Sequence, residues 1–322
     1  MESATKNRQE RGTIEKMTAS AFPGLHAVKI AELGEGYFNA AYSVRLSDGR
    51  DVILKIAPPK DYPVMTYEKD LMRAEVESMR LVRAKTDLPV AEVLCCDESR
   101  TICPSGYFFM SKLDGRSFST ASAGMSGEEK SSIQFQAGRM NRKLNGITGD
   151  SFGCFAGPEG RGRDWFSVFS GMLRDVFQDA GKMGIQLAVR FGEVQGLLSG
   201  SRRVFGEVTV PRLVHWDLWA GNIFVENGRI TGIIDFERCL WADVLMESGF
   251  RTGNQDPDFL RGYGMEAPTE AQRIRIAWYD LYLFLIMSME SEYRNYPNLD
   301  QKVWAEKKVL GSLDFLNKAG LS

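Results

Sequence analysis

Histidine is scarce in this chain, and its scarcity argues against one class of metal site. Only His26 and His215 occur among 322 residues, so we do not expect a zinc site built from several histidine ligands. The five cysteines are odd in number, and no pair has the spacing of metal ligands. Cys95 and Cys96 are adjacent, which suits neither a shared metal nor an ordinary disulfide. We therefore expect unpaired thiols in a reducing compartment.

The chain also lacks long apolar runs and an excess of charge of either sign. No run approaches the roughly 20 apolar residues that a membrane helix needs. The opening segment MESATKNRQERGTIEK has no apolar signal-peptide core, and we expect its first dozen residues to form a flexible tail. The net charge of −2 gives no reason to expect nucleic acid or a membrane as a partner. We expect a cytoplasmic protein, either a monomer or a homodimer.

The residues that are present divide the chain into two regions of different pattern. In the first region, alternating apolar positions and turn signals such as Ser47–Arg50 predict a small antiparallel sheet, with one main helix at 67–85. In the second region the apolar spacing is mostly helical, but two short strands joined by Asn227–Gly228 predict an embedded hairpin. We therefore expect an α+β protein of two lobes, at 1–112 and 113–322.

The stretch VHWDLWAGNIFVENGRITGIIDFE, Val214–Glu237, concentrates polar side chains around this hairpin. A hairpin brings its ends together, so Asn222 before the first strand and Asp235 after the second are expected to converge. An amide oxygen and a carboxylate that converge suit magnesium. Asp217 lies close enough in sequence to accept a proton from a hydroxyl beside that metal, as phosphoryl transfer requires. Singly these residues are ordinary turn and cap residues, and only their joint pattern favours catalysis.

The spacing His-x-Asp-x4-Asn, followed by a hairpin and Asp-Phe-Glu, resembles the aminoglycoside phosphotransferase and choline kinase family, which is related to the protein kinases. The resemblance implies a bilobal protein-kinase-like fold in which Asp217 is the catalytic carboxylate. It implies that Asn222 and Asp235 hold Mg²⁺ and that His215 braces the loop. Trp216 stands where the family most often has glycine.

A kinase-like first lobe requires a glycine loop and a lysine paired with a glutamate. Gly34 and Gly36, with Asn39 nearby, supply a loop whose backbone N–H groups are able to approach phosphates. Lys55 lies in an apolar strand. On the following helix Glu75 shares the apolar stripe better than its alternative Glu77, so we predict that Glu75 holds Lys55 against the phosphates.

The segment YFFMSKLDG resembles the hinge that carries the nucleotide base in such kinases. We expect backbone contacts at Met110 and Ser111, to within one or two residues. The cofactors implied by the resemblance are ATP or GTP together with Mg²⁺.

The sequence says less about the phosphate acceptor than about the fold or the chemistry. A polycationic antibiotic needs a cleft lined by carboxylates, and Glu237, Asp243 and Glu247 are the candidate contacts, although the interleaved arginines also fit an ordinary solvated surface. The acceptor is expected to be a small hydroxyl compound. An aminoglycoside would imply antibiotic resistance, whereas choline, a sugar or an amino alcohol would imply a metabolic kinase.

A pseudokinase module that only binds nucleotide is a third hypothesis. It is disfavoured because the chain has every residue type that catalysis needs, at Lys55, Glu75, Asp217, Asn222 and Asp235.

Overall fold

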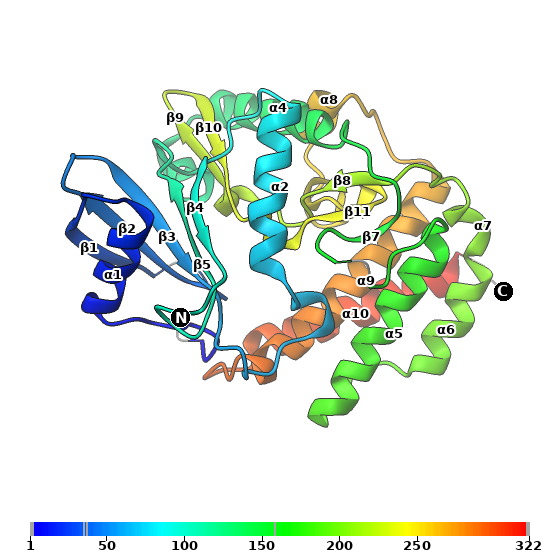
Figure 1. Cartoon of the computed structure of the whole chain (residues 1–322). Coiled ribbons are helices and arrows are strands. Elements are labelled where there is room, and N and C mark those ends of the chain that lie inside the picture. The colour runs from blue at the N-terminus through cyan, green and yellow to red at the C-terminus, as the bar shows by residue number, and fades with distance from the viewer. Residues whose placement is uncertain (1–2, 35, 37, 158, 320–322) are drawn as a thin grey trace.

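The computed structural model describes residues 3–34, 36, 38–157 and 159–319, which form a small sheet-rich lobe and a larger helical lobe (Figure 1). The first lobe is built on an antiparallel sheet of five strands in the order β1-β2-β3-β5-β4. These strands are β1 (Ala27–Leu33), β2 (Ala40–Leu46), β3 (Asp51–Ile56), β4 (Val93–Asp97) and β5 (Tyr107–Ser111).

One helix, α2 (Leu71–Lys85), lies between this sheet and the second lobe (Figure 1). Its apolar residues recur at helical spacing, and one face, which includes Met72, Val76 and Met79, is buried. The same face carries Glu75, which is fully buried. The helix also contacts the turn Phe236–Arg238 of the second lobe, so it connects the sheet to the residues after the hairpin.

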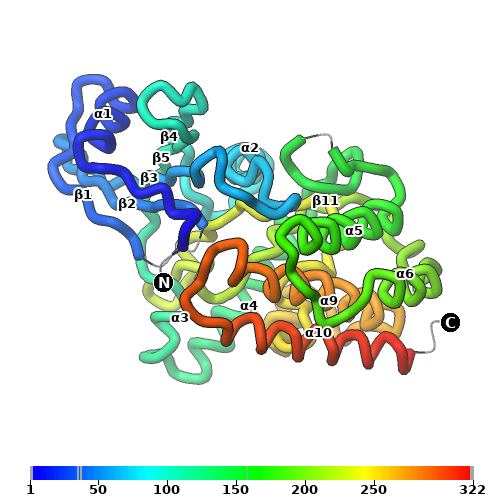
Figure 2. The backbone as a smooth tube through the Cα atoms, turned by 90° about the horizontal axis from the view of Figure 1, so that it is seen from below, coloured from blue at the N-terminus to red at the C-terminus, as the bar shows by residue number. Residues whose placement is uncertain are grey.

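The beginning of the chain is not the flexible tail that its polar composition led us to expect. Thr5 is only 1% exposed, and the N–H of Ala4 donates to the carbonyl of Arg294 in the second lobe at 3.2 Å. The N–H of Gln9 donates to the hydroxyl of Tyr42 at 3.0 Å. Figure 2 shows this segment beside the loop that follows α9, ahead of helix α1 (Arg11–Ala21). These tertiary contacts, which local composition does not reveal, order the segment.

The second lobe surrounds one long central helix, α9 (Glu270–Tyr293), most of whose residues are buried. Helix α10 (Asp300–Lys318) packs along it (Figure 2). The remaining helices are α3 (Phe118–Ala121), α4 (Gly127–Leu144), α5 (Trp165–Met183), α6 (Phe191–Gly200), α7 (Arg202–Phe205) and α8 (Pro257–Tyr263). Capping boxes at Ser126 and Thr269 begin α4 and α9, which is the local signal that fixes both starts.

Two small sheets are embedded in the helical lobe. One has the order β10-β9-β6 and the other β7-β11-β8. Their strands are β6 (Arg116–Ser117), β7 (Gly153–Cys154), β8 (Arg212–Val214), β9 (Ile223–Glu226), β10 (Arg229–Ile233) and β11 (Leu240–Ala242). Asn227 and Gly228 both have positive φ and close the β9–β10 hairpin as their sequence predicts. The α+β architecture of two lobes expected from the sequence is confirmed.

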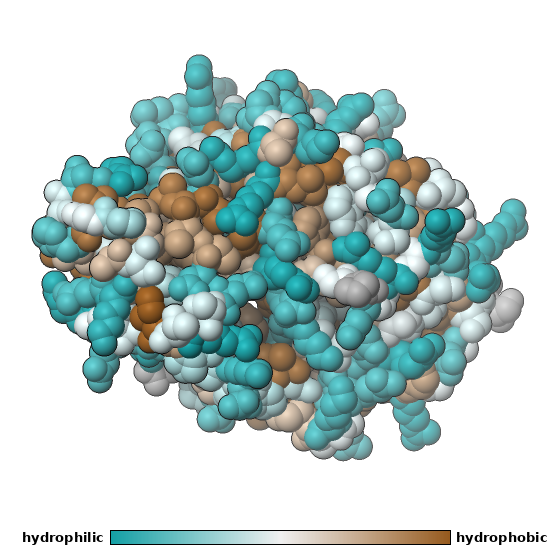
Figure 3. Space-filling model, viewed as in Figure 1, coloured by the Kyte–Doolittle hydropathy of each residue, from teal (hydrophilic) through white to brown (hydrophobic). Residues whose placement is uncertain are grey.

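The surface is mostly hydrophilic on the face shown in Figure 3, where apolar side chains gather on either side of α2. Within the described part of the chain, no helix combines the length and apolar character needed to cross a membrane. The five cysteines, all in described positions, are free thiols.

Candidate active site

The loop after β8 has an uncommon backbone conformation that is fixed from both sides. Trp216 has a φ of +66°, a left-handed conformation that side chains other than glycine rarely adopt. The carboxylate of Glu247 accepts the N–H of His215 at 2.9 Å and the N–H of Trp216 at 3.1 Å. The guanidinium of Arg251 donates to the Trp216 carbonyl. This clamp orients the next residue, Asp217.

His215 joins the loop to the strand that leads to Asp235. Its ring Nε2 lies 2.9 Å from the carbonyl of Ile234, and its ring packs 4.6 Å from that of Phe236. The side chain is fully buried. The ring therefore links the loop after β8 to the end of β10.

Asn222 and Asp235 lie next to each other. The N–H of Ile234 donates to the Asn222 carbonyl at 3.0 Å, which ties the start of β9 to the residue before Asp235. The Asn222 amide donates to the Asp217 carbonyl at 2.9 Å and leaves its oxygen as a potential ligand. An amide oxygen beside a carboxylate suits Mg²⁺. No cluster of three or more acidic, histidine or cysteine side chains that could hold a metal occurs in the described part of the chain.

Lys55 connects the two lobes at this point. Its amine lies 2.5 Å from Glu75 and also pairs with Asp235. Burial opposes the positive charge, but the carboxylates of Asp235 and Glu75 outweigh it and raise the pKa of Lys55. For Asp235 burial again opposes the charge, yet Lys55 lowers its pKa. Lys55 is therefore a permanent cation facing the metal-ligand candidates.

The glycine loop approaches the same region. The Asn39 amide donates to Glu237 at 2.7 Å, which links the loop to the second lobe. Burial, together with the nearby Asp235 and Glu75 carboxylates, raises the pKa of Glu237 to about 8. The carbonyl of Gly34 accepts a hydrogen bond from Lys6 at 3.3 Å. Gly36 lies on the loop between β1 and β2, and its neighbours 35 and 37 are outside the described residues.

The two expected hinge residues lie inside strand β5. Met110 is paired with Ile53 of β3, and the N–H of Ser111 already donates to the Glu92 carbonyl at 2.9 Å. The chain leaves the strand at the next residue, Lys112. The first backbone groups outside the strand therefore lie within the margin of one or two residues that we gave for the hinge.

Two of the three acidic acceptor contacts expected from the sequence are internal. Asp243 is 5% exposed and accepts hydrogen bonds from Arg275 at 2.9 Å and from the Tyr279 hydroxyl at 2.8 Å. Glu247 is fully buried under the loop after β8, where it accepts hydrogen bonds from the N–H groups of His215 and Trp216. The structure corrects our expectation for both, because their oxygens are occupied by the protein.

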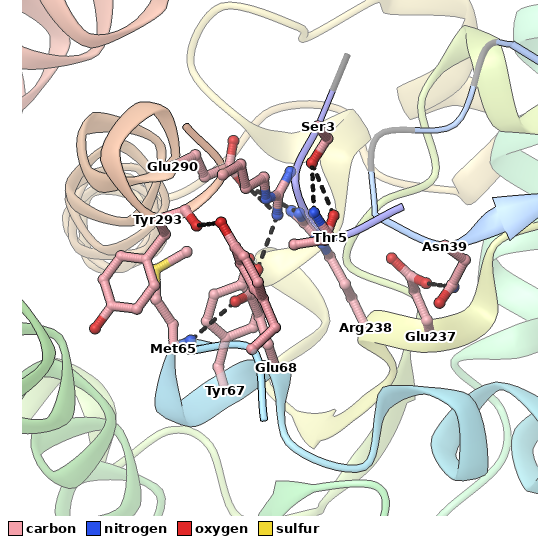
Figure 4. A network of polar contacts seen from close by, with 12 residues as sticks. Ser3, Thr5, Asn39, Met65, Tyr67, Glu68, Glu237, Arg238, Glu290 and Tyr293 are labelled. Carbon is pink, nitrogen blue, oxygen red and sulfur yellow. Dashed lines mark hydrogen bonds and ion pairs between the residues drawn. The ribbon is translucent and has the colours of Figure 1, made fainter. Parts of the chain in front are cut away.

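A buried chain of charged residues that we did not anticipate borders the site (Figure 4). Glu290 at the end of α9 pairs with both Arg238 and Arg294 at 3.1 Å, and Arg294 pairs with Glu68 of the first lobe at 2.8 Å. Arg238 lies over the rings of Tyr67 and Trp216, at 5.5 and 5.9 Å from their centroids. The only sequence signal was the position of Arg238, directly after the Asp-Phe-Glu motif.

Comparisons with known proteins match this architecture. A family model described as "Phosphotransferase enzyme family" matches residues 29–272. The structure of aminoglycoside phosphotransferase APH(4)-Ia in complex with ADP and hygromycin B superposes with a TM-score of 0.66 at 18% identity, covering 96% of this chain and 99% of that one. A putative fructosamine-3-kinase from Thermobifida fusca has a TM-score of 0.66 at 18% identity, covering 95% and 100%.

One curated relative is more similar in sequence but over a short region. A subtelomeric hrmA-associated cluster protein of Aspergillus fumigatus is 32% identical over 116 residues. The matched region is 36% of this chain and spans 22% of the length of that relative.

Proposed function

Because the chain belongs to the phosphotransferase enzyme family and has a protein-kinase-like fold, we propose that it transfers the γ-phosphate of ATP or GTP to a hydroxyl of a small molecule. In this proposal residues 1–112 bind the nucleotide, and residues 113–322 supply the catalytic loop and the acceptor cleft. The observation that supports it is a pair of hydrogen bonds: the Ile234 N–H donates to the Asn222 carbonyl, and the Asn222 amide donates to the Asp217 carbonyl, so the backbone of the three proposed site segments lies together.

Each residue has a distinct role in the proposed reaction. Asp217 orients the acceptor hydroxyl and accepts its proton as the oxygen attacks the γ-phosphorus. The bond between the γ-phosphorus and the β,γ-bridging oxygen breaks, and the nucleoside diphosphate leaves. Lys55, held by Glu75, binds the α- and β-phosphates. Glycines 34 and 36 allow the loop backbone to cover the phosphates, and Asn39 fixes that loop over Glu237.

Asn222 and Asp235 would hold Mg²⁺, which neutralises charge on the phosphates. His215 supports the loop by its contact with Ile234. The base of the nucleotide is proposed to contact the backbone at 112 and 113, directly after Met110 and Ser111.

The proposal is tested by measuring ADP and GDP release with Mg²⁺ over a panel of hydroxyl acceptors. Asp217→Asn should reduce turnover by about 10²- to 10⁴-fold, since general-base catalysis typically contributes that much. Its nucleotide affinity should change little, whereas Asp235→Ala should weaken Mg-nucleotide binding as well. Asp150→Asn, at an exposed position, is the matched control. Full activity in Asp217→Asn would show that another group is the base.

A further inference from the structure

Two arginines flank the Trp216–Asp217 step, where the acceptor hydroxyl must lie if the proposed function is correct. Arg251 donates to the Trp216 carbonyl, and Arg238 lies over the Trp216 ring. Both guanidinium groups are close enough to interact electrostatically with the Asp217 carboxylate. The proposed base is thus bordered by positive charge on two sides.

The carboxylates that pair with Arg238 and Arg294 are already occupied. Glu290 accepts from Arg238 and Arg294, and its other oxygen accepts from Gln301 at 2.6 Å. Glu68 accepts from Arg294 and from the N–H of Met65 at 2.9 Å. A polycationic ligand would have to break these pairs to obtain a counter-charge.

The arginines, in contrast, retain unused donors. The Nε atoms of Arg238 and Arg294 are buried and have no hydrogen-bond partner among the described residues. Arg251 forms no salt bridge with a carboxylate among the described residues, and its guanidinium donates to the backbone carbonyl of Trp216. Guanidinium donors in a fixed orientation recognise carboxylate and phosphate groups in particular.

Two of the three acidic candidates expected from the sequence add no negative charge to the cleft. Asp243 is paired with Arg275, and Glu247 is covered by the catalytic loop. The stacking of Arg238 against Tyr67 and Trp216 holds its guanidinium in one plane, as recognition of a planar acid requires.

We propose that the acceptor carries an acidic group, a carboxylate or a phosphate, in addition to its reacting hydroxyl, and that Arg238 and Arg251 bind this group. The inference rests on the proposed function and names the substrate class of the same site. The reacting hydroxyl would then face Asp217 while the acid lies on the arginine side. A polyamine would be disfavoured because like charges would meet in a partly desolvated cleft.

Matched hexoses of different charge test this directly. Glucuronate, glucose 6-phosphate, glucose and glucosamine are titrated separately into the full chain with MgATP, followed by kanamycin as a polycation. A bound hexose raises the rate of ADP release if it accepts phosphate, and lowers that rate if it only displaces the water that hydrolyses ATP. The hexose concentration at which the rate changes gives an apparent affinity for that hexose. We expect an acidic hexose to bind at least about tenfold more tightly than glucosamine, as expected for charge-assisted hydrogen bonds. Comparing glucuronate with glucose 6-phosphate distinguishes a carboxylate from a phosphate.

Variants separate recognition of the acceptor from binding of the nucleotide. Arg251→Gln and Arg238→Gln should each reduce the preference for the acidic hexose towards unity, and Arg251→Lys should restore part of it. Arg229→Gln, at an exposed site on the hairpin, should behave like the unmodified chain. Thermal melting verifies that each variant is folded.

Three results would overturn the proposal. The first is tighter binding of glucosamine or kanamycin, and the second is an equal or undetectable response to all four hexoses. The third is a rise in the KM for MgATP in the arginine variants without a change in acceptor preference, which would assign the arginines to the nucleotide. In each case ADP release that is lost in Asp217→Asn would leave the proposed function standing. Absence of any Asp217-dependent release would remove both proposals.

Discussion

Replacing Trp216 by glycine sets two opposing energies against each other. The residue has a φ of +66°, which glycine adopts without strain. Its side chain is only 1% exposed, stacks on Tyr282 with ring centroids 5.5 Å apart, and meets Tyr67 edge-on at 5.7 Å. Glycine would relieve the backbone but remove all of this packing.

The packing should dominate. A left-handed conformation costs a residue other than glycine about 1–2 kcal/mol. Truncating a buried tryptophan typically costs about 3–5 kcal/mol, because the transfer energy is lost and a cavity is left. We therefore expect Trp216→Gly to reduce the free energy of unfolding by about 2–3 kcal/mol. Arg238 would also lose one of the two rings that orient it.

Urea unfolding followed by circular dichroism measures this difference. Trp216→Phe keeps the strain and part of the packing, so its loss should be smaller. Trp219→Ala, in the same loop but 46% exposed, should change the free energy of unfolding by less than about 1 kcal/mol. If Trp216→Gly were as stable as the parent chain, backbone strain would outweigh packing, and the reasoning would be wrong.

Three further changes have defined outcomes. Glu247→Gln replaces one of the oxygens that accept the N–H groups of His215 and Trp216 by an NH2 donor. The free energy of unfolding should therefore fall by about 2–3 kcal/mol, as measured by melting. The kcat for ADP release should also fall, while the affinity for nucleotide stays constant. Lys55→Met removes the counter-charge of the fully buried Glu75, so both the stability of the protein and its affinity for nucleotide should fall. Thermal melting measures the first effect and nucleotide titration the second. An unchanged affinity for nucleotide would contradict the role proposed for Lys55. Gly138→Ala should destabilise the fold, because the added Cβ would clash with the carbonyl of Phe259. Gly171→Ala in α5 has open space around the added Cβ, so it should raise the free energy of unfolding by about 0.5–1 kcal/mol in the same melts.

The sequence predicted the fold because its signals are local. Asn227–Gly228 defines a hairpin by its own backbone preferences, and a hairpin necessarily brings its ends together. Likewise the stripe of α2 placed Glu75 on the buried face before any tertiary contact was known. The roles assigned to these residues remain predictions until the variants are measured.

What the sequence could not indicate depends on distant partners. The sequence did not show whether an acidic side chain faces a cleft or a partner within the protein. Asp243 accepts a hydrogen bond from Arg275 of α9, and Glu247 accepts one from the loop some thirty residues before it. The polar start of the chain likewise gave no sign that Tyr42 and Arg294 would hold it. The exact hinge residues stay a prediction, because strand ends are poorly defined by local pattern.

The anchored beginning of the chain has a practical consequence for producing the protein. Thr5 is buried, Ala4 is hydrogen-bonded to Arg294, and Arg294 belongs to the charged chain that borders the proposed acceptor site. An affinity tag placed just before this segment would therefore lie a few residues from that charged chain. The end of helix α10 lies at the far side of the helical lobe (Figure 1). A purification tag placed after α10 should therefore disturb the proposed acceptor site less than one placed before Ser3.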